Sequence, residues 1–344
     1  MRRRTRPRPV IGALRALSEA GTGALRRRAM AAKPPVARPS AADRVRKLLA
    51  RDEPLVMGGF YDGVSARLVE RAGFPLAFMG GYAVAASMLG EPDIGLLTQA
   101  EMADAARRLC RLISAPVLVD ADTGYGNVPN VVRTAELYAQ AGAAGLFLED
   151  QVWPKRCGHM AGKEVVERRD WLTKLNAVVK LRPALDMFVV ARTDARGPKG
   201  LKEAIVRGRA ARDLGVDAVF VEAPQSVAEL DAIALGVPGP KIANMVEWGR
   251  TPLLSPKELH QRGFDLIVYP VAAILAQARA IEDVYSALRH EGGTASLMSR
   301  MFPFEEFNHL MGLDRQRERE RAAVPIVEVK REAPPPNGRR RRSA

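Results

Sequence analysis

A cysteine with a close histidine neighbour lies in the basic segment PKRCGH, residues 154–159. Cys157 can be a small buried hydrophobe, a metal ligand, half of a disulfide or a group that transfers a proton. The only other cysteine, Cys110, lies in the helix-like stretch AEMADAARRLCRLISA, where we expect it to be buried core. Two cysteines do not make the framework of a secreted disulfide protein, and they favour a reducing, cytoplasmic location.

A zinc site is the next alternative for this thiol. Structural zinc is held by about four Cys or His ligands at fixed spacings. The chain offers two cysteines and four scattered histidines, His159, His260, His290 and His309. Cys157 is therefore either a structural residue or a proton-transfer group, and the rest of the chain must decide between them.

Carboxylates are the second group of residues that could do chemistry. Polar side chains follow the strand-like segments at Asp62, Asp120, Asp122, Glu149, Asp150, Arg192, Asp194, Glu222, Asn244 and Glu247. Asp120 and Asp122 are two apart, so on a strand they would point to the same face and repel unless a cation lay between them. Hard oxygen ligands suit Mg²⁺, with Mn²⁺ as a substitute. The competing interpretation is that these acids cap the helices that follow.

The elements that must position these residues alternate regularly along the chain. Short apolar runs predict strands at 55–60, 76–81, 116–122, 145–150, 187–195, 218–223, 241–247 and 266–270. Segments with helical spacing lie between them, and several end in a glycine suited to a left-handed C-cap. Eight such units predict an α/β fold, a parallel (β/α)₈ TIM-type barrel, whose active sites lie at the carboxyl ends of the strands. No G-x-G-x-x-G or Walker-type loop supports a nucleotide-binding alternative.

The positive charge of the chain is concentrated at its ends. The formal net charge is +14, but residues 1–51 carry 15 Lys and Arg against 2 Asp and Glu, and residues 315–344 carry 10 against 4. The middle of the chain is net negative, so we expect no nucleic-acid partner. We expect basic disordered tails at 1–40 and 313–344 around a (β/α)₈ barrel domain at 41–312. The first tail resembles a transit peptide or an over-extended start before Met30, and no apolar run approaches the ~18 residues of a membrane span.

Five motifs together carry a family resemblance. LVDADTGYGN, LEDQVWPKRCGH, VVARTDA, VFVEAP and ANMVEWGRTPL resemble, in order and spacing, the isocitrate lyase/phosphoenolpyruvate mutase superfamily, over residues 40–312. The resemblance implies that Asp120 binds Mg²⁺ directly, that Asp122 and Glu149 bind it through water, and that Asp93 lies nearby. It also implies that Arg192 and Asn244 bind an α-keto acid or its enolate.

The remaining site residues follow from the same resemblance. The candidate substrate-binding residues are Gly80, Gly81, Tyr82, Asp93, Lys155, Arg192, Glu222 and Asn244. Gly80 stands where many relatives have a hydroxyl residue, so one contact to the substrate carboxylate would come from backbone N–H groups alone. The candidate catalytic residues are Cys157, His159, Glu222 and Tyr82.

The reaction implied by the resemblance gives the thiol a role. Retro-aldol cleavage of a 2-hydroxy di- or tricarboxylate would yield pyruvate and a second carboxylate through a pyruvate enolate, and a carbon must then receive a proton. Cys157 can deliver it, with Lys155 and Arg156 bringing its pKa toward neutrality and His159 ordering the loop or assisting the thiol. The base that takes the hydroxyl proton is Glu222 or Tyr82. The alternatives are a carboxyphosphonoenolpyruvate mutase and an oxaloacetate decarboxylase or hydrolase.

Two further expectations concern the substrate and the assembly. Methylisocitrate lyases usually have an arginine directly after the Cys-Gly-His motif, whereas this chain has Met160, so we expect a dicarboxylate such as 2,3-dimethylmalate to be preferred. Lys163 or Arg168 could compensate for the missing charge. The segment SLMSRMFPFEEFNHLMGL has many apolar residues after the last strand, and the family resemblance implies a C-terminal helix exchanged between subunits. We expect a homotetramer without membrane or nucleic-acid partners.

Overall fold

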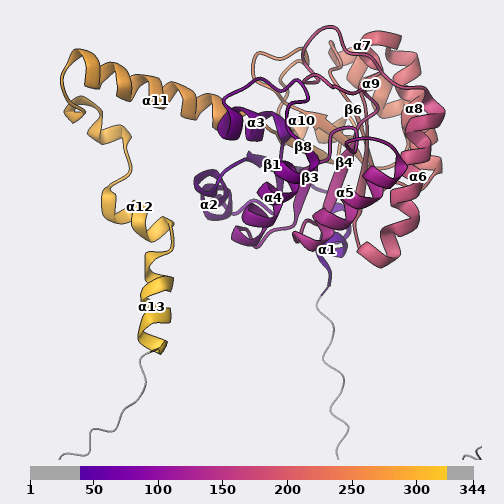
Figure 1. Cartoon of the computed structure of the whole chain (residues 1–344). Helices are drawn as coiled ribbons and strands as arrows, with labels where there is room; N and C mark the ends of the chain where they lie inside the picture. The colour runs from indigo at the N-terminus through magenta and orange to yellow at the C-terminus, as the bar shows by residue number, and fades with distance from the viewer. Residues whose placement is uncertain (1–38, 324–344) are drawn as a thin grey trace, which may run out of the picture. The chain divides into compact units, whose positions relative to one another are not determined.

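Eight short parallel strands close into a barrel in the computed structural model, which describes residues 39–323. The strands are β1 (Leu55–Phe60), β2 (Leu76–Met79), β3 (Val117–Asp120), β4 (Gly145–Leu148), β5 (Phe188–Thr193), β6 (Ala218–Val221), β7 (Lys241–Asn244) and β8 (Leu266–Tyr269). Each strand pairs with the next along the chain, and β8 pairs with β1. The predicted (β/α)₈ TIM-type barrel is confirmed (Figure 1).

Helices between the strands cover the outside of the barrel, and the helices after the last strand extend away from it (Figure 1). They are α1 (Ala41–Leu49), α2 (Gly63–Ala72), α3 (Gly81–Leu89), α4 (Gln99–Leu109), α5 (Val128–Gln140), α6 (Arg168–Leu185), α7 (Arg196–Lys199), α8 (Leu201–Asp213), α9 (Val227–Gly236), α10 (Pro256–Gln261), α11 (Ala272–His290), α12 (Phe304–Leu310) and α13 (Leu313–Ala323), with 3₁₀ turns at Cys110–Leu112 and Ala295–Arg300. Gly142, Gly215 and Gly263 have positive φ after α5, α8 and α10, as the sequence predicts. None of the helices in residues 39–323 has the length and apolar character of a bilayer span.

Several observed strands end before the segments predicted from sequence. β3 stops at Asp120 rather than at 122, and β4 stops at Leu148 rather than at 150. Backbone hydrogen bonds still join the two segments beyond these ends, because the N–H of Ala121 donates to the carbonyl oxygen of Phe147 and the N–H of Glu149 donates to that of Asp122. The polar residues at these strand ends therefore lie in loops that contacts with neighbouring segments hold in place.

Aromatic rings fill the barrel interior beneath the rim. Phe147 packs edge-on against Phe78, with ring centroids 4.9 Å apart, and against Phe220, with centroids 6.0 Å apart. All three rings line the cavity at the carboxyl ends of the strands. Cys110 is buried in the outer layer of the core, as expected, and remains a free thiol. The aromatic layer thus forms a dry floor for a polar site.

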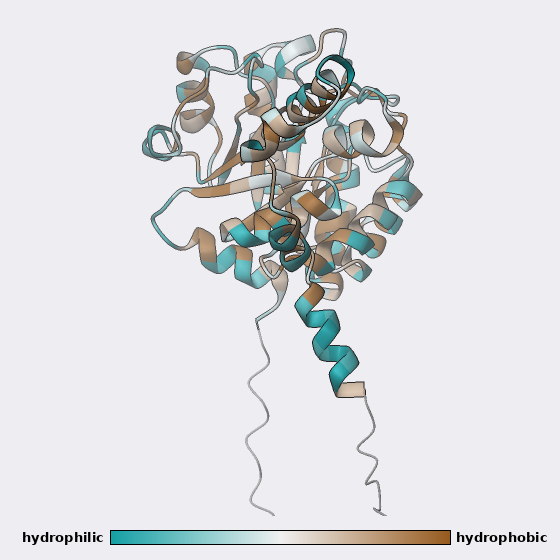
Figure 2. Cartoon of the chain, turned by 90° about the vertical axis from the view of Figure 1, so that its left-hand side faces the viewer, coloured by the Kyte–Doolittle hydropathy of each residue, from teal (hydrophilic) through white to brown (hydrophobic). Residues whose placement is uncertain are grey.

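The chain after the last strand is largely solvent-exposed in this single chain. Ala287 is the only buried residue of α11 among its 19 positions. The aromatic residues Phe302 and Phe304 are 44% and 85% exposed. The helix α13 is hydrophilic along most of its length (Figure 2) and occupies residues that the sequence assigns to the C-terminal tail. The rest of that tail, and residues 1–38, lie outside the described residues.

A glycine on β1 permits the closure of the barrel. A Cβ atom added at Gly59 would lie 2.5 Å from the carbonyl oxygen of Pro270 and 2.7 Å from its Cα, which are backbone atoms that cannot rotate away. We expect Gly59→Ala to destabilise the fold by about 1–3 kcal/mol, the usual cost of overpacking. Thermal unfolding measures the loss. Gly293→Ala, where an added Cβ meets nothing within 4 Å, is the matched control and should unfold like the parent.

Candidate active site

Two aspartates after β3 face the start of α3. The backbone N–H of Asp122 donates to Asp120 Oδ1 at 3.0 Å, and the N–H of Gly81 donates to Asp120 Oδ2 at 3.4 Å. The sequence argument that both side chains share one face of a strand is wrong, because the strand ends at Asp120 and Asp122 has a left-handed φ of 46°. The turn still brings the carboxylates together, since an added Cβ at Gly81 would lie 3.5 Å from Asp122 Oδ1 and 3.6 Å from Asp120 Oδ2.

Lys155 binds the carboxylates on this side of the rim. Its Nζ lies 2.5 Å from Asp93 Oδ1 and 2.8 Å from Asp122 Oδ1, and its side chain is buried. Burial lowers the pKa of Lys155, but Asp122, Asp93 and Glu149 outweigh burial and raise it well above its ordinary value. Burial raises the pKa of Asp122 to about 6, against the opposing effect of Lys155. Lys155 is therefore a cation of the carboxylate cluster.

Arg192, near the end of β5, is the buried centre of a second charge cluster. Its Nε lies 2.9 Å from Asp194 Oδ2 and 3.3 Å from Glu149 Oε2, and its Nη2 lies 3.3 Å from Glu222 Oε2. Its guanidinium also lies over the ring of Phe220, 5.4 Å from the centroid. Three carboxylates from the ends of β4, β5 and β6 thus surround one cation.

Glu222 is held as a carboxylate in the middle of the site. His159 Nε2 lies 3.2 Å from its Oε1, and Asn244 Nδ2 lies 3.3 Å from its Oε2. Burial raises the pKa of Glu222, but Arg192 and His159 outweigh burial, so the net pKa is below the ordinary value. An ionised carboxylate in a cavity can accept a proton.

Cys157 lies on the loop between β4 and α6, over the cavity. Burial raises the pKa of its thiol to about 11, which the backbone N–H of His159 opposes. The expectation that Lys155 and Arg156 bring this pKa toward neutrality is wrong. Lys155 points to the aspartates, and the backbone of Arg156 is held by the Gln151 side chain. Cys157 is therefore a neutral thiol that holds its proton at physiological pH.

The candidate residues surround one cavity of about 370 Å³. Its lining includes the predicted residues Gly80, Gly81, Tyr82, Asp93, Asp120, Cys157, His159, Arg192, Glu222 and Asn244. Asp122, Glu149 and Lys155 lie just behind this lining and reach it through their contacts with Asp120, Arg192 and Asp93. Burial raises the pKa of Tyr82, with Cys157 and Asp93 adding to the effect, so its phenol is a poor base.

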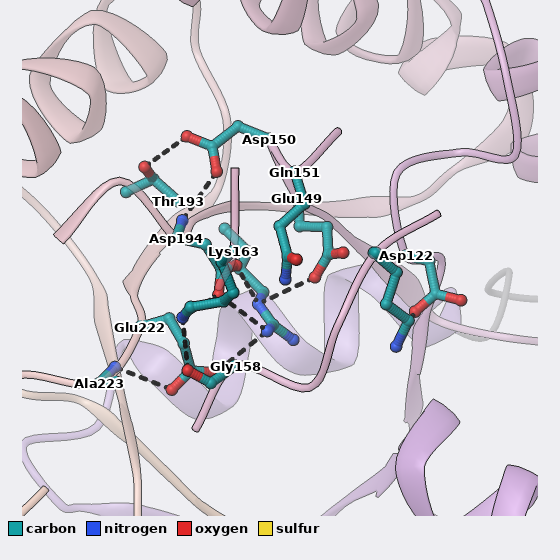
Figure 3. A network of polar contacts seen from close by, with 12 residues as sticks. Asp122, Glu149, Asp150, Gln151, Gly158, Lys163, Thr193, Asp194, Glu222 and Ala223 are labelled. Carbon is teal, nitrogen blue, oxygen red and sulfur yellow. Dashed lines mark hydrogen bonds and ion pairs between the residues drawn. The ribbon is translucent and has the colours of Figure 1, made fainter. Parts of the chain in front are cut away.

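The strand-end acids do not all face this cavity. Asp62 caps α2, accepting from the backbone N–H of Ser65 at 2.7 Å, so the capping interpretation holds for it. Asp150 is turned toward the outer layer, where its Oδ2 accepts from Arg207 Nη1 at 3.0 Å. Its Oδ1 accepts from the N–H of Asp194 at 2.7 Å (Figure 3). Asp150 therefore supports the loop that carries Asp194.

The carboxylate cluster has the donor chemistry that Mg²⁺ requires. The side-chain oxygens of Asp122 and Glu149 are buried and accept no hydrogen bond of good geometry, although Lys155 and Arg192 lie near them. Within residues 39–323 no group of three His, Cys, Asp or Glu side chains lies close enough to hold a metal without added ligands. A hard cation that binds few carboxylates and retains several waters fits such a donor set.

Asp194 belongs to the site although the sequence did not assign it a role there. Asp194 pairs with both Arg192 and Lys163, and its position two residues after Arg192 on a strand is a signal that could have identified it. Lys163 pairs with Asp194, and Arg168 pairs with Glu203 at 2.8 Å on the outer helices. Neither residue lines the main cavity, so neither replaces the arginine absent at Met160.

The chain is similar to known proteins over most of its length. Residues 45–289 match the family model described as phosphoenolpyruvate phosphomutase. The chain is 44% identical to the 2,3-dimethylmalate lyase of Eubacterium barkeri, over 80% of this chain and 96% of that protein. It is 41% identical to the 2-methylisocitrate lyase of Halalkalibacterium halodurans, over 73% of this chain and 83% of that protein.

Solved structures are also similar to this chain over most of its length. An oxaloacetate acetylhydrolase in complex with 3,3-difluorooxalacetate superposes with a TM-score of 0.79 and 36% identity, over 83% of this chain and 97% of that one. A phosphonopyruvate hydrolase in complex with oxalate and Mg²⁺ superposes with a TM-score of 0.75 and 25% identity, over 83% of this chain and 100% of that one.

A cavity lined by carboxylates at the carboxyl ends of the strands is typical of TIM-barrel enzymes. The comparisons specify the family. The chain belongs to the phosphoenolpyruvate phosphomutase family, within the isocitrate lyase/phosphoenolpyruvate mutase superfamily. The resemblance drawn from its five motifs is confirmed.

The high pKa of Cys157 predicts how the thiol reacts. Only the thiolate is nucleophilic, so its rate of alkylation by iodoacetamide should rise about tenfold per pH unit up to at least pH 10. Mass spectrometry of the Cys157 peptide measures the rate. A plateau below pH 9 would show an activated thiolate and would contradict this assignment. Chemical alkylation of free cysteine under the same conditions is the control for the reagent.

Proposed function

We propose that this protein is a Mg²⁺-dependent carbon–carbon lyase that cleaves a 2-alkylmalate of the 2,3-dimethylmalate kind to pyruvate and a second carboxylate. The observation that carries the proposal is that one cavity presents an ionised carboxylate, Glu222, and a protonated thiol, Cys157. Cleavage of a 2-hydroxy acid needs both a group that removes a proton and one that returns it. The similarity to 2,3-dimethylmalate lyase supports the same reaction.

The metal would be held by the acids at the ends of β3 and β4. Asp120 would bind it directly, and Asp122 and Glu149 would bind its waters. The buried oxygens of Asp122 and Glu149, which accept no hydrogen bond of good geometry, support this assignment. When bound, Mg²⁺ would supply positive charge that favours ionisation of the 2-hydroxyl group of the substrate.

Substrate binding would use the polar groups that lie next to these acids. Arg192 and Asn244 would bind the carboxylate that becomes part of pyruvate, and the N-terminus of α3 at Gly80 and Gly81 would add backbone N–H donors. Asp93 would act through Lys155, because these two groups bind each other. Tyr82 lines the cavity as a neutral phenol and would donate a hydrogen bond.

Glu222 is the better candidate for the base. Its pKa is lowered, so it is ionised at neutral pH, whereas Tyr82 has a raised pKa. Removal of the 2-hydroxyl proton by Glu222 would let the C2–O bond become a carbonyl as the C2–C3 bond breaks. His159 would keep Glu222 in place through the contact between Nε2 and Oε1.

Atom balance corrects one part of the sequence-based mechanism. In 2,3-dimethylmalate the carbon that bears the hydroxyl and a methyl group becomes the carbonyl carbon of pyruvate. The electron pair of the broken bond therefore stays on C3, next to the second carboxylate, and no pyruvate enolate forms. The carbanion of the departing acid is the group that needs a proton, and the neutral thiol of Cys157 would donate it.

The cavity favours an alkyl-substituted dicarboxylate over a tricarboxylate. Arg192 is the single arginine or lysine among the described residues that line it. The lining beyond the charged groups is apolar and includes Met160, Val246, Val271 and Leu275. A third carboxylate would be buried without a cationic partner, which is costly.

The assembly and location remain expectations of the same proposal. We propose a cytoplasmic homotetramer in which the exposed segment after β8, with Phe302 and Phe304, packs against a neighbouring subunit. Apolar surface of this kind is typical of an interface. Light scattering at micromolar concentration tests the assembly.

A pyruvate-release assay tests the reaction. We expect kcat/KM for 2,3-dimethylmalate to exceed that for 2-methylisocitrate by roughly tenfold or more, because a hydrogen bond to a charged group is worth about 1.5–3 kcal/mol. Met160→Arg should narrow the difference, and chelation of Mg²⁺ should abolish turnover. A preference for the tricarboxylate would overturn the substrate assignment. Oxalate release from oxaloacetate in the same panel, without pyruvate from either malate, would instead identify a hydrolase.

The proton donor is tested by Cys157→Ser. A serine hydroxyl is a weaker acid than the thiol, so kcat should fall by roughly a hundredfold or more. Binding of pyruvate with Mg²⁺ should change little, because Arg192 and Asn244 remain. Cys110→Ser is the matched control at the buried structural thiol and should retain kcat in the folded fraction. An unchanged kcat in Cys157→Ser would make that cysteine structural.

A further inference from the structure

Arg250 binds His159 by two hydrogen bonds from a different loop. Its backbone N–H donates to His159 Nδ1 at 2.9 Å, and its side-chain Nε donates to the carbonyl oxygen of His159 at 2.9 Å. The preceding residue packs as closely, because a Cβ added at Gly249 would lie 2.6 Å from His159 Nδ1. Arg250 follows β7 and is 91 positions further along the chain than His159. The two loops are therefore joined at one histidine.

The first of these bonds determines the tautomer of His159. A backbone N–H only donates, so Nδ1 must be the unprotonated, accepting nitrogen of the ring. The ring hydrogen then lies on Nε2, which approaches Glu222 Oε1 to 3.2 Å without the geometry of a hydrogen bond. Arg250 therefore orients the edge of the imidazole that lies against the carboxylate assigned as base.

The Cys157 loop has a separate anchor on its other side. Lys163 Nζ donates to the carbonyl oxygen of Gly158 and lies 2.7 Å from Asp194 Oδ1 (Figure 3). Gly158 itself packs against Glu222, since an added Cβ would lie 2.5 Å from the carboxyl carbon. Two consecutive carbonyls of the loop, those of residues 158 and 159, are thus each bound by a cationic side chain.

The two anchors differ in what they connect. Lys163 belongs to the loop and ties it to the end of β5. In the described part of the chain, both hydrogen bonds between this loop and the segment after β7 come from Arg250. Arg250 lies outside the lining of the main cavity and instead borders a neighbouring cavity of about 190 Å³ with Met160 and Lys163. It does not reach the substrate, so any effect on turnover must act through His159.

We propose that Arg250 is a positioning residue that fastens the Cys157 loop to the segment after β7 and holds His159 against Glu222. The effect of Arg250 on turnover rests on the proposed function, whereas its link between the two loops does not. Loss of the side-chain bond should shift the loop toward open states, which expose Cys157 and displace His159 from Glu222.

The test compares Arg250→Ala and Arg250→Lys with Arg133→Ala, a matched loss of an exposed arginine on α5. One readout is the rate of Cys157 alkylation by iodoacetamide at fixed pH, followed by mass spectrometry of its peptide. The others are kcat and KM in the pyruvate-release assay and the affinity for oxalate with Mg²⁺.

Arg250→Ala should raise the alkylation rate and lower kcat by roughly two- to tenfold each, the worth of one net hydrogen bond, with little change in oxalate affinity. Arg250→Lys should fall between Arg250→Ala and the parent, because the ammonium group can still donate to the carbonyl. Arg133→Ala should match the parent in all three readouts. Gly249→Ala, which crowds His159 directly, should exceed Arg250→Ala in both alkylation rate and loss of kcat.

An unchanged alkylation rate in both Arg250→Ala and Gly249→Ala would overturn the proposal. A loss of kcat without faster alkylation would overturn it as well, because the residue would then act by another route. Faster alkylation in the variants, with no turnover of any tested substrate by the parent, would support the link and refute the proposed function. The experiment therefore distinguishes failure of the Arg250 proposal from failure of the proposed function.

Discussion

The site depends on the burial of one cation, Arg192, among carboxylates from three strands. Taking a guanidinium and its partners out of water is costly, and removal of one partner leaves the others unpaired at a cost of about 3–5 kcal/mol. The strand register is what keeps the set together, because Arg192 pairs with Phe220 on β6, and Leu148 on β4 pairs with Ala191. Closure of the barrel therefore also determines which charged groups meet in the site.

The sequence predicted the architecture because the physical signals for it are local. Alternating apolar runs and helical segments identify eight units, and glycines such as Gly142 and Gly215 mark helix ends through a conformation that other residues resist. The rim was predicted for a similar reason, since parallel strands place their carboxyl ends together. Family motifs then assigned roles to Asp120, Arg192 and Asn244 that composition alone could not.

The parts that failed are those set by tertiary contacts. The left-handed turn at Asp122 cannot be read from a strand pattern, and it is what brings the two aspartates together. The pKa of Cys157 follows from burial, which residues 155 and 156 do not reveal although both are basic. The sequence also did not show which carboxylates face the cavity. Asp62 caps a helix and Asp150 faces Arg207, whereas Glu222 lines the cavity.

The division of the cavity wall between strands and loops has a consequence for substitutions in this site. The charged groups occupy strand ends where each is bound to several others, so replacement of any one disturbs the whole barrel rim. Met160 and Trp248 instead line the cavity from loops, and Trp248 is 91% exposed. Substitutions at exposed loop positions usually change stability by less than about 0.5 kcal/mol. Single substitutions in these loops can therefore change the cavity wall at little cost in stability, whereas substitutions at the strand ends disturb the buried ion pairs.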